Sequence, residues 1–351
     1  MELIYIANTD ATEAYPHTAN KPKSLLKVLG HTAIEHNLSQ AAKFCSRIIV
    51  AVGFKAAMIK QRLGESFEGK PVIYVDVMPN ACETEIIKAC RGYIKKDFIM
   101  MNDNGLYSGI DIKNCIDAGQ AMLICDNGRC GLYSFVFEDV QEIISKGFTA
   151  AVSQVKPLGI KDYYLPLVYP WHILEANVFL LRRFDGFANH GTVEPNVTIK
   201  GDVYIGHGTT IKGFCYIEGP AFIDDNCLIG PFAYIRKDSI IGKGVQVGRM
   251  EMFDVVIMDG FTSKHTSYAG HSVIGEKGNF GAGTITSDYR HDGGTHTTLI
   301  NGKKVDTGRR KLGAFLGDNV NTGIGTLLYP GRKIWPGGST LPGEVVKADK
   351  M

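Results

Sequence analysis

The chain has 351 residues, of which 44% are apolar and 21% charged, which is typical of a globular protein of about two domains. Its 38 basic and 36 acidic residues leave a net charge of +2, which gives no reason to expect a nucleic acid or a membrane surface as a partner. The N-terminus carries no signal-type segment, no apolar run reaches ~18 residues, and the eight cysteines lack zinc-type pairs. We therefore expect a cytoplasmic protein with free thiols and no metal site.

Short apolar strands alternate with amphipathic helices over residues 1–185. This alternation favours an α/β domain with a parallel, doubly wound, Rossmann-like sheet. A further helix is expected from Pro170, which suits a first helical turn, and residues 185–190 read as a linker. The expected elements, in chain order, are strands at 3–7 and 47–53, a helix at 55–64, a strand at 70–77, a helix at 83–94 and a strand at 97–101.

From residue 193 onward the chain follows a six-residue repeat. Ten positions spaced six residues apart carry only valine or isoleucine, and the fourth residue after each of the first nine has a small or slim side chain. At 44% apolar content, ten apolar residues in one fixed register would arise by chance about three times in ten thousand. The ten are Val193, Ile199, Ile205, Ile211, Ile217, Ile223, Ile229, Ile235, Ile241 and Val247.

Such a repeat indicates a prism of stacked coils, each built from three hexapeptides with the aliphatic side chain inward. An ordinary β-sandwich would instead show a period of two without a six-residue register. The register breaks after Val247 and returns at 274–280, which predicts an insertion containing "FTSKHTSYAGHS". A second insertion is predicted around 291–311, before the register resumes at Leu316. In a repeat scaffold, insertions often carry the function.

This hexapeptide pattern resembles the left-handed parallel β-helix acyltransferases. Its stretch "SKHTSYAGHSVIGEKGNFGAGTITSDY" is similar to the acetyltransferase half of bifunctional N-acetylglucosamine-1-phosphate uridylyltransferases, and more so to archaeal-type sugar-1-phosphate nucleotidylyltransferases with the same β-helix. The similarity runs from about Val193 to Val346. It implies an all-β left-handed parallel β-helix acyltransferase domain over 192–351, a homotrimer, and acetyl-CoA as co-substrate in the groove between neighbouring chains.

The resemblance also implies site residues. His265 would be the general base, since an imidazole can accept the proton that an amino-sugar nitrogen loses as it attacks a thioester. Glu251, fourteen residues earlier, would orient that imidazole. The residues matching those that hold the sugar phosphate and the amino sugar are Arg236, Tyr268, Asn279 and Tyr289, of which the two tyrosines could equally be packing residues; Ala282 and Thr326 match residues of the coenzyme A site.

Two positions depart from the acyltransferase pattern. Phe253 stands where the family has a phosphate-binding lysine, and Asp288 stands where it has an asparagine. The basic residues of 303–311 could supply the lost positive charge, or could form a plain solvated loop. These departures leave the identity of the acceptor open, but they affect the expected class of reaction less.

The N-terminal half resembles nucleotidylyltransferases that join a sugar-1-phosphate to a nucleotide, through the stretch "NKPKSLLKVLGHTAIEHNL". The loop before it has no glycine, and Glu13 stands in place of a catalytic arginine, so that a like charge worth ~4 kcal/mol faces a triphosphate. Lys23 alone is not expected to compensate. In "NDNG", Asn104 replaces a metal-binding aspartate, although Asp103 is adjacent. We therefore expect a degenerate nucleotide site, with Mg²⁺ needed only if this domain is active.

The sequence thus predicts an acetyl-CoA-dependent N-acetyltransferase that acts on an amino sugar, in particular an amino-sugar-1-phosphate. Its partners would be small molecules, a sugar phosphate and an acyl-CoA, and further copies of the chain. Two alternatives remain open. One is an active nucleotidylyltransferase with unusual ligands, and the other is a non-enzymatic protein that binds a sugar phosphate or regulates another protein.

Overall fold

The computed structural model describes residues 1–126 and 128–351. Their contacts group them into two compact units, which are described separately. The N-terminal unit comprises Met1–Ala11, Lys21–Leu26 and His31–Val168. The β-helix unit comprises Thr12–Asn20, Lys27–Gly30 and Tyr169–Met351. Among the helices in the described parts of the chain, none is long and apolar enough to cross a membrane.

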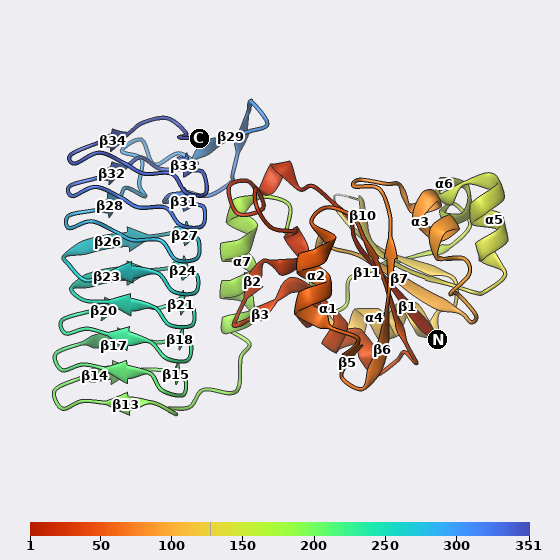
Figure 1. The fold of residues 1–351 in the computed structure, drawn as a ribbon, viewed down its shortest axis with the longest axis horizontal. Coiled ribbons are helices and arrows are strands. Elements are labelled where there is room, and N and C mark those ends of the chain that lie inside the picture. Colours follow the sequence, from red (N-terminus) through yellow and green to blue (C-terminus); the bar gives the residue numbers. More distant parts are fainter. Residues whose placement is uncertain (127) are drawn as a thin grey trace. The chain divides into compact units, whose positions relative to one another are not determined.

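The N-terminal unit is built on an eight-stranded mixed sheet with the order β11-β9-β10-β7-β1-β4-β6-β5 (Figure 1). Its central strands are parallel, as the alternation of strands and helices predicts. The strands are β1 (Glu2–Ala7), β4 (Ile48–Val52), β5 (Ser66–Phe67), β6 (Lys70–Asp76), β7 (Phe98–Asn102), β9 (Ala121–Cys125), β10 (Gly128–Phe135) and β11 (Lys156–Gly159), and a separate antiparallel pair joins β8 (Gly105–Tyr107) to β12 (Tyr164–Pro166).

Helices cover both faces of this sheet, which is why β1 is buried along its whole length. Leu3 and Tyr5 belong to one hydrophobic core, and Ile4 and Ile6 belong to the other. The helices α1 (Ala33–Ala42), α2 (Ala56–Leu63) and α4 (Gly109–Asp117) contribute to the first core, and α3 (Glu83–Cys90), α5 (Asp139–Lys146) and α6 (Phe148–Val152) contribute to the second.

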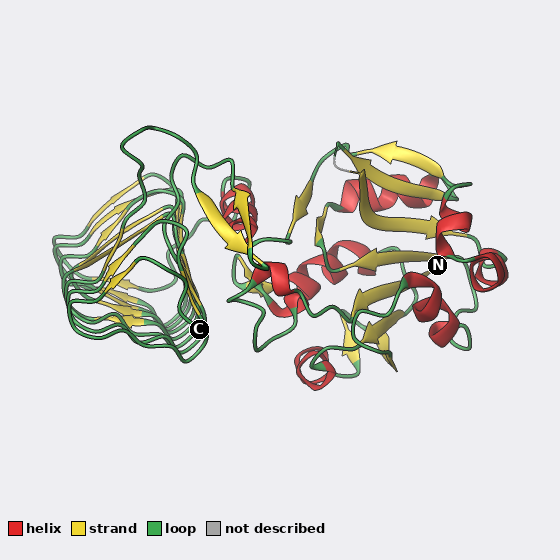
Figure 2. Ribbon diagram, turned by 90° about the horizontal axis from the view of Figure 1, so that it is seen from above, coloured by secondary structure: helices red, strands yellow, loops and turns green. Residues whose placement is uncertain are grey.

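The β-helix unit stacks short parallel strands into three long sheets, whose successive coils superpose in the view of Figure 2. The first face carries β13 (Thr192–Val193), β16 (Thr210–Ile211), β19 (Leu228–Ile229), β22 (Gln246–Val247) and β25 (Thr262–Ser263). The second face carries β14 (Thr198–Lys200), β17 (Tyr216–Glu218), β20 (Tyr234–Ile235), β23 (Met250–Phe253), β26 (Ser267–Gly270), β28 (Ile285–Thr286), β32 (Leu327–Leu328) and β34 (Val345–Val346). The third face carries β15 (Val203–Ile205), β18 (Ala221–Ile223), β21 (Ser239–Ile241), β24 (Val256–Ile257), β27 (Val273–Ile274), β31 (Phe315–Leu316) and β33 (Lys333–Ile334).

The six-residue register places its aliphatic side chains inside the prism, as expected. Ile217 and Ile223 are fully buried, and the slim residues Cys215 and Cys227 are buried beside them in the same core. Ile199 is the exception and remains 38% exposed. It lies in the first coil, where β14 pairs with β17 on one side alone among the described strands. The predicted fold class, an α/β domain followed by a β-helix, agrees with this architecture.

One expectation about the β-helix is wrong. The stretch "FTSKHTSYAGHS" is not an insertion, because its residues form β25 and β26 and continue the stack. Ile241 pairs with Ile257 and Ile257 pairs with Ile274, so that coils of 16 and 17 residues follow coils of 18. Shorter turns between the strands therefore displaced the sequence register while the coils themselves continued.

The second insertion is confirmed. Ile274 pairs directly with Leu316, and the intervening chain includes a hairpin of β29 (Thr297–Ile300) and β30 (Lys303–Asp306) that projects from the stack (Figure 1). Helix α7 (Pro170–Leu181) begins at Pro170 as predicted and packs along β21, β24 and β27 within the β-helix unit.

Candidate active site

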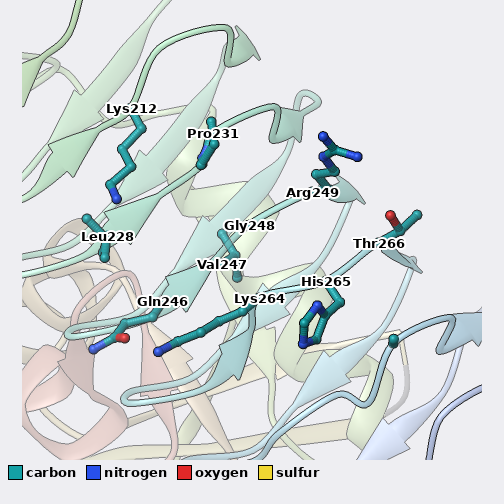
Figure 3. Close-up of a pocket in the computed structure, with 12 residues that line it drawn as sticks. Lys212, Leu228, Pro231, Gln246, Val247, Gly248, Arg249, Lys264, His265 and Thr266 are labelled. Atoms are coloured by element: carbon teal, nitrogen blue, oxygen red, sulfur yellow. The ribbon is translucent and has the colours of Figure 1, made fainter.

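His265 lies at the corner of the β-helix where β25 turns into β26, and its side chain is exposed. It lines a groove of ≈ 620 Å³, which we call the corner groove. Figure 3 shows the imidazole, Lys264 and Lys212 extending to one side of this corner, whereas Arg249 and Thr266 extend to the other. The twelve residues of the lining include three lysine or arginine residues, one histidine and no acidic residue; they are Lys212, Leu228, Gly230, Pro231, Gln246, Val247, Gly248, Arg249, Lys264, His265, Thr266 and Ala282.

A second groove of ≈ 390 Å³, the acceptor groove, lies over the second face of the β-helix. Glu251 and Tyr268 both line it, because β23 and β26 pair in a register that sets these two residues directly opposite each other. The two grooves share Arg249 and Thr266, so His265 stands next to a residue that belongs to both. An imidazole beside the junction of two grooves is suited to group transfer between two ligands.

Glu251 pairs with Arg236 rather than with His265 among the described residues. Its Oε1 accepts a hydrogen bond of 3.0 Å from Nη1 of Arg236. The guanidinium of Arg236 also lies 4.0 Å from the centre of the Phe253 ring, a cation–π contact. The aromatic residue that stands in place of a lysine thus supports the guanidinium of Arg236.

The local structure explains why the motif "SYAGHS" combines a tyrosine with a glycine two residues later. The hydroxyl of Tyr268 donates a hydrogen bond of 2.9 Å to Oδ2 of Asp288. The tyrosine hydroxyl lies over Gly270, where an added Cβ would collide with this hydroxyl and crowd Asp288. Burial, followed by the nearby Asp288 carboxylate, raises the pKa of Tyr268 well above its usual range, so the phenol remains a donor.

A buried histidine that the sequence did not single out lies behind this tyrosine. His271 is 5% exposed, and its Nδ1 lies 2.6 Å from Oδ2 of Asp254. Its Nε2 lies 3.6 Å from Oδ2 of Asp288, so the imidazole stands between two carboxylates. The basic segment at the end of the insertion closes this cluster. Arg309 contacts Asp254 at 3.1 Å, and Lys311 contacts Asp288 at 3.0 Å.

The remaining predicted residues of the β-helix are distributed around the two grooves. Ala282 lines the corner groove. Tyr289 is exposed, and its backbone forms an isolated antiparallel β-bridge with that of Lys311. Asn279 accepts a hydrogen bond of 2.7 Å from Thr262 at the first face. Thr326 is fully buried, and its hydroxyl is held by Gly323 and Thr340, so this side chain does not line either groove.

The N-terminal unit brings Lys23, Asp103 and Asn104 together. Lys23 is 3% exposed, and its Nζ lies 2.5 Å from Oδ1 of Asn104 and 3.5 Å from Oδ1 of Asp103. Asp103 also accepts hydrogen bonds of 2.8 Å from Ser24 and 3.3 Å from Thr9. Lysine and aspartate therefore satisfy each other in a buried network. Among the described residues, no three histidine, cysteine, aspartate or glutamate side chains gather around Asp103 as metal ligands.

The segment with Glu13 belongs to the β-helix unit instead. Glu13 is exposed in a short 3₁₀ helix, η1 (Thr12–Ala14). Tyr15 and His17 lie edge-on to Trp335 and Phe315, both at 6.4 Å between ring centres. Asn301 donates a hydrogen bond of 3.0 Å to Thr12. The stretch that the resemblance assigns to triphosphate binding is thus packed on coils of the β-helix.

Comparison with known proteins gives a consistent family. No family model matches the chain. A protein of Methanococcus vannielii named "Bifunctional protein GlmU" is 30% identical over 402 residues, covering 100% of this chain and 95% of its own. A protein of the same name from Methanocaldococcus jannaschii is 30% identical over 391 residues, covering 97% and 94%.

A third relative, from Sulfurisphaera tokodaii, matches a shorter region. It is named "Bifunctional sugar-1-phosphate nucleotidylyltransferase/acetyltransferase" and is 40% identical over 197 residues, 56% of this chain and 49% of its own. The resemblance stated from the sequence is therefore confirmed. Since two GlmU proteins align over almost their full length with almost the whole chain, this chain belongs to the GlmU family of bifunctional transferases.

Proposed function

We propose that this chain transfers an acetyl group from acetyl-CoA to the amino group of an amino sugar, specifically an amino-sugar-1-phosphate. The observation that carries this proposal is the position of His265 in the corner groove, beside Thr266, which also lines the acceptor groove. In this assignment residues 192–351 form the acyltransferase domain, and residues 1–185 form a nucleotidyltransferase-like domain, of which segments 12–20, 27–30 and 169–185 belong to the β-helix unit by their contacts.

The chemistry requires one proton acceptor. His265 takes a proton from the amine as the nitrogen attacks the thioester carbonyl, and a C–N bond forms. The C–S bond then breaks, and the imidazolium returns the proton to the departing thiolate, so that the products are the N-acetyl sugar and free coenzyme A. His265 has the exposure that such an approach needs.

The corner groove suits the acyl donor. Lys212, Arg249 and Lys264 offer positive charge to the phosphates of coenzyme A, with apolar surface from Leu228 and Val247 between them. Ala282 lies in the same lining, as the resemblance implies for the coenzyme A site. Thr326 is buried, so we assign it to packing.

The acceptor groove suits a phosphorylated sugar. Tyr268 lines it with its hydroxyl, and Arg236 brings a guanidinium to Glu251, another lining residue. Tyr289 and Asn279 are exposed but do not line this groove, and Asn279 lies at the first face. Glu251 holds Arg236 in place, and this is the role that we propose for it, in place of orienting His265.

We also propose that the active form is a homotrimer. Ile285, Leu327 and Val345 occupy adjacent strands of the second face in register, and all three side chains are exposed. A row of exposed aliphatic side chains is typical of a surface that another protein covers. A second copy seated there would also wall the grooves. Light scattering should give three times the mass of the chain.

For the N-terminal unit we propose that nucleotidyl transfer is lost or strongly reduced. The buried pair of Lys23 and Asp103 and the packing of Tyr15 on Trp335 support this proposal. Incubation with Mg²⁺, a nucleoside triphosphate and a sugar-1-phosphate tests it. We expect no release of pyrophosphate, and clear turnover would restore the active nucleotidylyltransferase as the alternative.

The acetyl transfer itself is tested by its product. Mass spectrometry after incubation with acetyl-CoA and glucosamine 1-phosphate should detect a gain of one acetyl group on the sugar. The non-enzymatic alternative predicts that the sugar phosphate binds but stays unmodified with every amino sugar tried.

A further inference from the structure

The buried imidazole of His271 faces a carboxylate at each of its two ring nitrogens. Nδ1 lies 2.6 Å from Oδ2 of Asp254, and Nε2 lies 3.6 Å from Oδ2 of Asp288. Nε2 forms no hydrogen bond with any of the described residues. An ionised carboxylate only accepts hydrogen bonds, whereas a neutral imidazole has a single N–H and an imidazolium has two. Only the imidazolium can therefore present a donor to both carboxylates.

The charged groups around His271 balance when the imidazole itself is positive. Ion pairs join three carboxylates to two cations around it; these are Glu175, Asp254, Asp288, Arg309 and Lys311. Two further neighbours add no net charge: Arg182 is paired with Asp238, and His296, which lies against the backbone of Asp288, has its pKa lowered by burial. Among the described residues the cluster thus has one negative charge in excess. An imidazolium at His271 neutralises it in a buried place, where an unpaired charge is costly.

Asp288 connects His271 to the acceptor groove. Its Oδ2 accepts the hydrogen bond of 2.9 Å from the hydroxyl of Tyr268, and the same oxygen faces Nε2 of His271. Tyr268 lines the acceptor groove. Because the phenol donates its one proton to Asp288, the lone pairs of its oxygen remain free to accept a hydrogen bond from an amine or a hydroxyl of a sugar. The orientation of the carboxylate therefore sets the direction in which this acceptor points.

The backbone at His271 is compatible with a neutral and with a positively charged replacement. Its φ of 49° lies in the left-handed region, where asparagine, aspartate and histidine are enriched among residues other than glycine. An asparagine would keep that conformation and carry no charge. Lys277 of the same β-helix has a φ of 55°, so a lysine can also adopt it and would place a positive charge between the two carboxylates. These two replacements separate the charge of His271 from its shape.

We propose that His271 is a positioning residue for the amino-sugar acceptor: its imidazolium holds the Asp288 carboxylate so that the oxygen of Tyr268 faces the sugar. The assignment rests on the proposed acetyl transfer and adds a residue that does not itself touch the substrate. Tyr268 lines the acceptor groove and not the corner groove, so loss of the His271 charge affects the acceptor and not acetyl-CoA. It also sets an alkaline limit, because His265 must be neutral to accept a proton whereas His271 must be charged to hold Asp288.

Steady-state kinetics of His271→Asn and His271→Lys test this assignment. We expect His271→Asn to raise the KM for glucosamine 1-phosphate by at least ~5-fold and to leave the KM for acetyl-CoA unchanged, while His271→Lys stays within about two-fold of wild type in both. The kcat/KM for the acceptor should fall at alkaline pH in wild type but persist to pH ~9 in His271→Lys, because lysine keeps its proton there. Equal behaviour of the two variants, or an equal change in both KM values, would mean that the charge of His271 does not position the acceptor and would overturn the proposal.

Solid-state nitrogen-15 NMR of protein labelled at histidine separates this proposal from the acetyl transfer, because it requires no turnover. The ring signals of His271 are those that disappear in either variant. We expect both ring nitrogens to carry a proton at neutral pH in wild type. If wild type shows this imidazolium but transfers no acetyl group, the proposed reaction fails and the charged histidine stands. If one ring nitrogen lacks a proton at neutral pH, the proposal for His271 fails whatever the reaction.

Discussion

Nζ of Lys23 and Oδ1 of Asp103 lie 3.5 Å apart in the N-terminal unit, and the side chains are 3% and 1% exposed. In the resemblance Lys23 belongs to the triphosphate site of a nucleotidylyltransferase, and Asp103 is adjacent to Asn104, which stands in place of a metal-binding aspartate. Here each residue instead satisfies the other, with help from Asn104 and Ser24. We therefore expect this buried ion pair to stabilise the fold, so that removal of the lysine lowers the free energy of unfolding.

Lys23→Met should destabilise the chain, because it leaves the Asp103 carboxylate buried without its cation. Removal of one partner of a buried pair costs about 3–5 kcal/mol of unfolding free energy. Urea denaturation measures it, and Lys88→Met on the surface of α3 is the matched control. If the Lys23 and Lys88 variants are equally stable, the pair of Lys23 and Asp103 does not stabilise the fold, and Lys23 is then available to bind a ligand.

Asp288→Asn should strengthen the binding of a phosphorylated acceptor. The amide oxygen can still accept the hydrogen bond of Tyr268, while the negative charge 3.0 Å from Lys311 is removed. We expect the KM for glucosamine 1-phosphate to fall several-fold, on the order of 1 kcal/mol of binding. A KM that rises for the phosphorylated sugar would show that the Asp288 carboxylate positions Tyr268 and Lys311 instead of repelling the phosphate.

Phe253→Lys should strengthen the binding of a phosphorylated acceptor. The new ammonium would project from β23 beside Arg236, which lies over the present ring at 4.0 Å. Calorimetric titration of glucosamine 1-phosphate into wild type and the variant should show several-fold tighter binding to the variant, on the order of 1 kcal/mol. Unchanged or weaker binding, in a variant that melts like wild type, would argue that this position does not face the phosphate.

Tyr268 should give the stability of the β-helix unit a pH dependence in the alkaline range. Burial, and then Asp288, raise the pKa of its hydroxyl, whereas in the unfolded chain the pKa is ~10. The folded state therefore keeps the proton longer, so the stabilisation is complete below pH ~10 and is lost as the pH rises above that value. Tyr268→Phe should be less stable than wild type by about 1–2 kcal/mol at neutral pH. That difference should shrink above pH ~10, and a constant difference up to pH ~11 would contradict the assignment.

The β-helix could be predicted from sequence because its rule is local. The six-residue spacing of valine and isoleucine is visible in the sequence, and it predicts correctly that Ile217, Ile223 and their equivalents are buried. The coils around His265 could not be predicted in this way. Two of their turns are shorter, so the sequence register shifts, although β25 and β26 continue the stack. A change of one or two residues in turn length looks like an insertion when only the spacing is visible.

The candidate site was predictable only in part. His265 and Tyr268 stand in a specific motif, so a family resemblance found them. The contact of Lys311 with Asp288 depends on how an insertion folds back, and that of Tyr15 with Trp335 joins residues from opposite ends of the sequence. Neither pair has a spacing or a periodicity that marks it, so only the three-dimensional structure reveals them.

The most direct test of the central proposal is the rate of thiol release from acetyl-CoA in the presence of glucosamine 1-phosphate, compared between wild type and His265→Ala. His291→Ala, which removes an exposed histidine outside both grooves, is the control. We predict that wild type and the His291 variant release thiol at equal rates and that His265→Ala is slower by ~10²–10⁴-fold. Equal rates for wild type and His265→Ala, or no thiol release by wild type, would contradict the account.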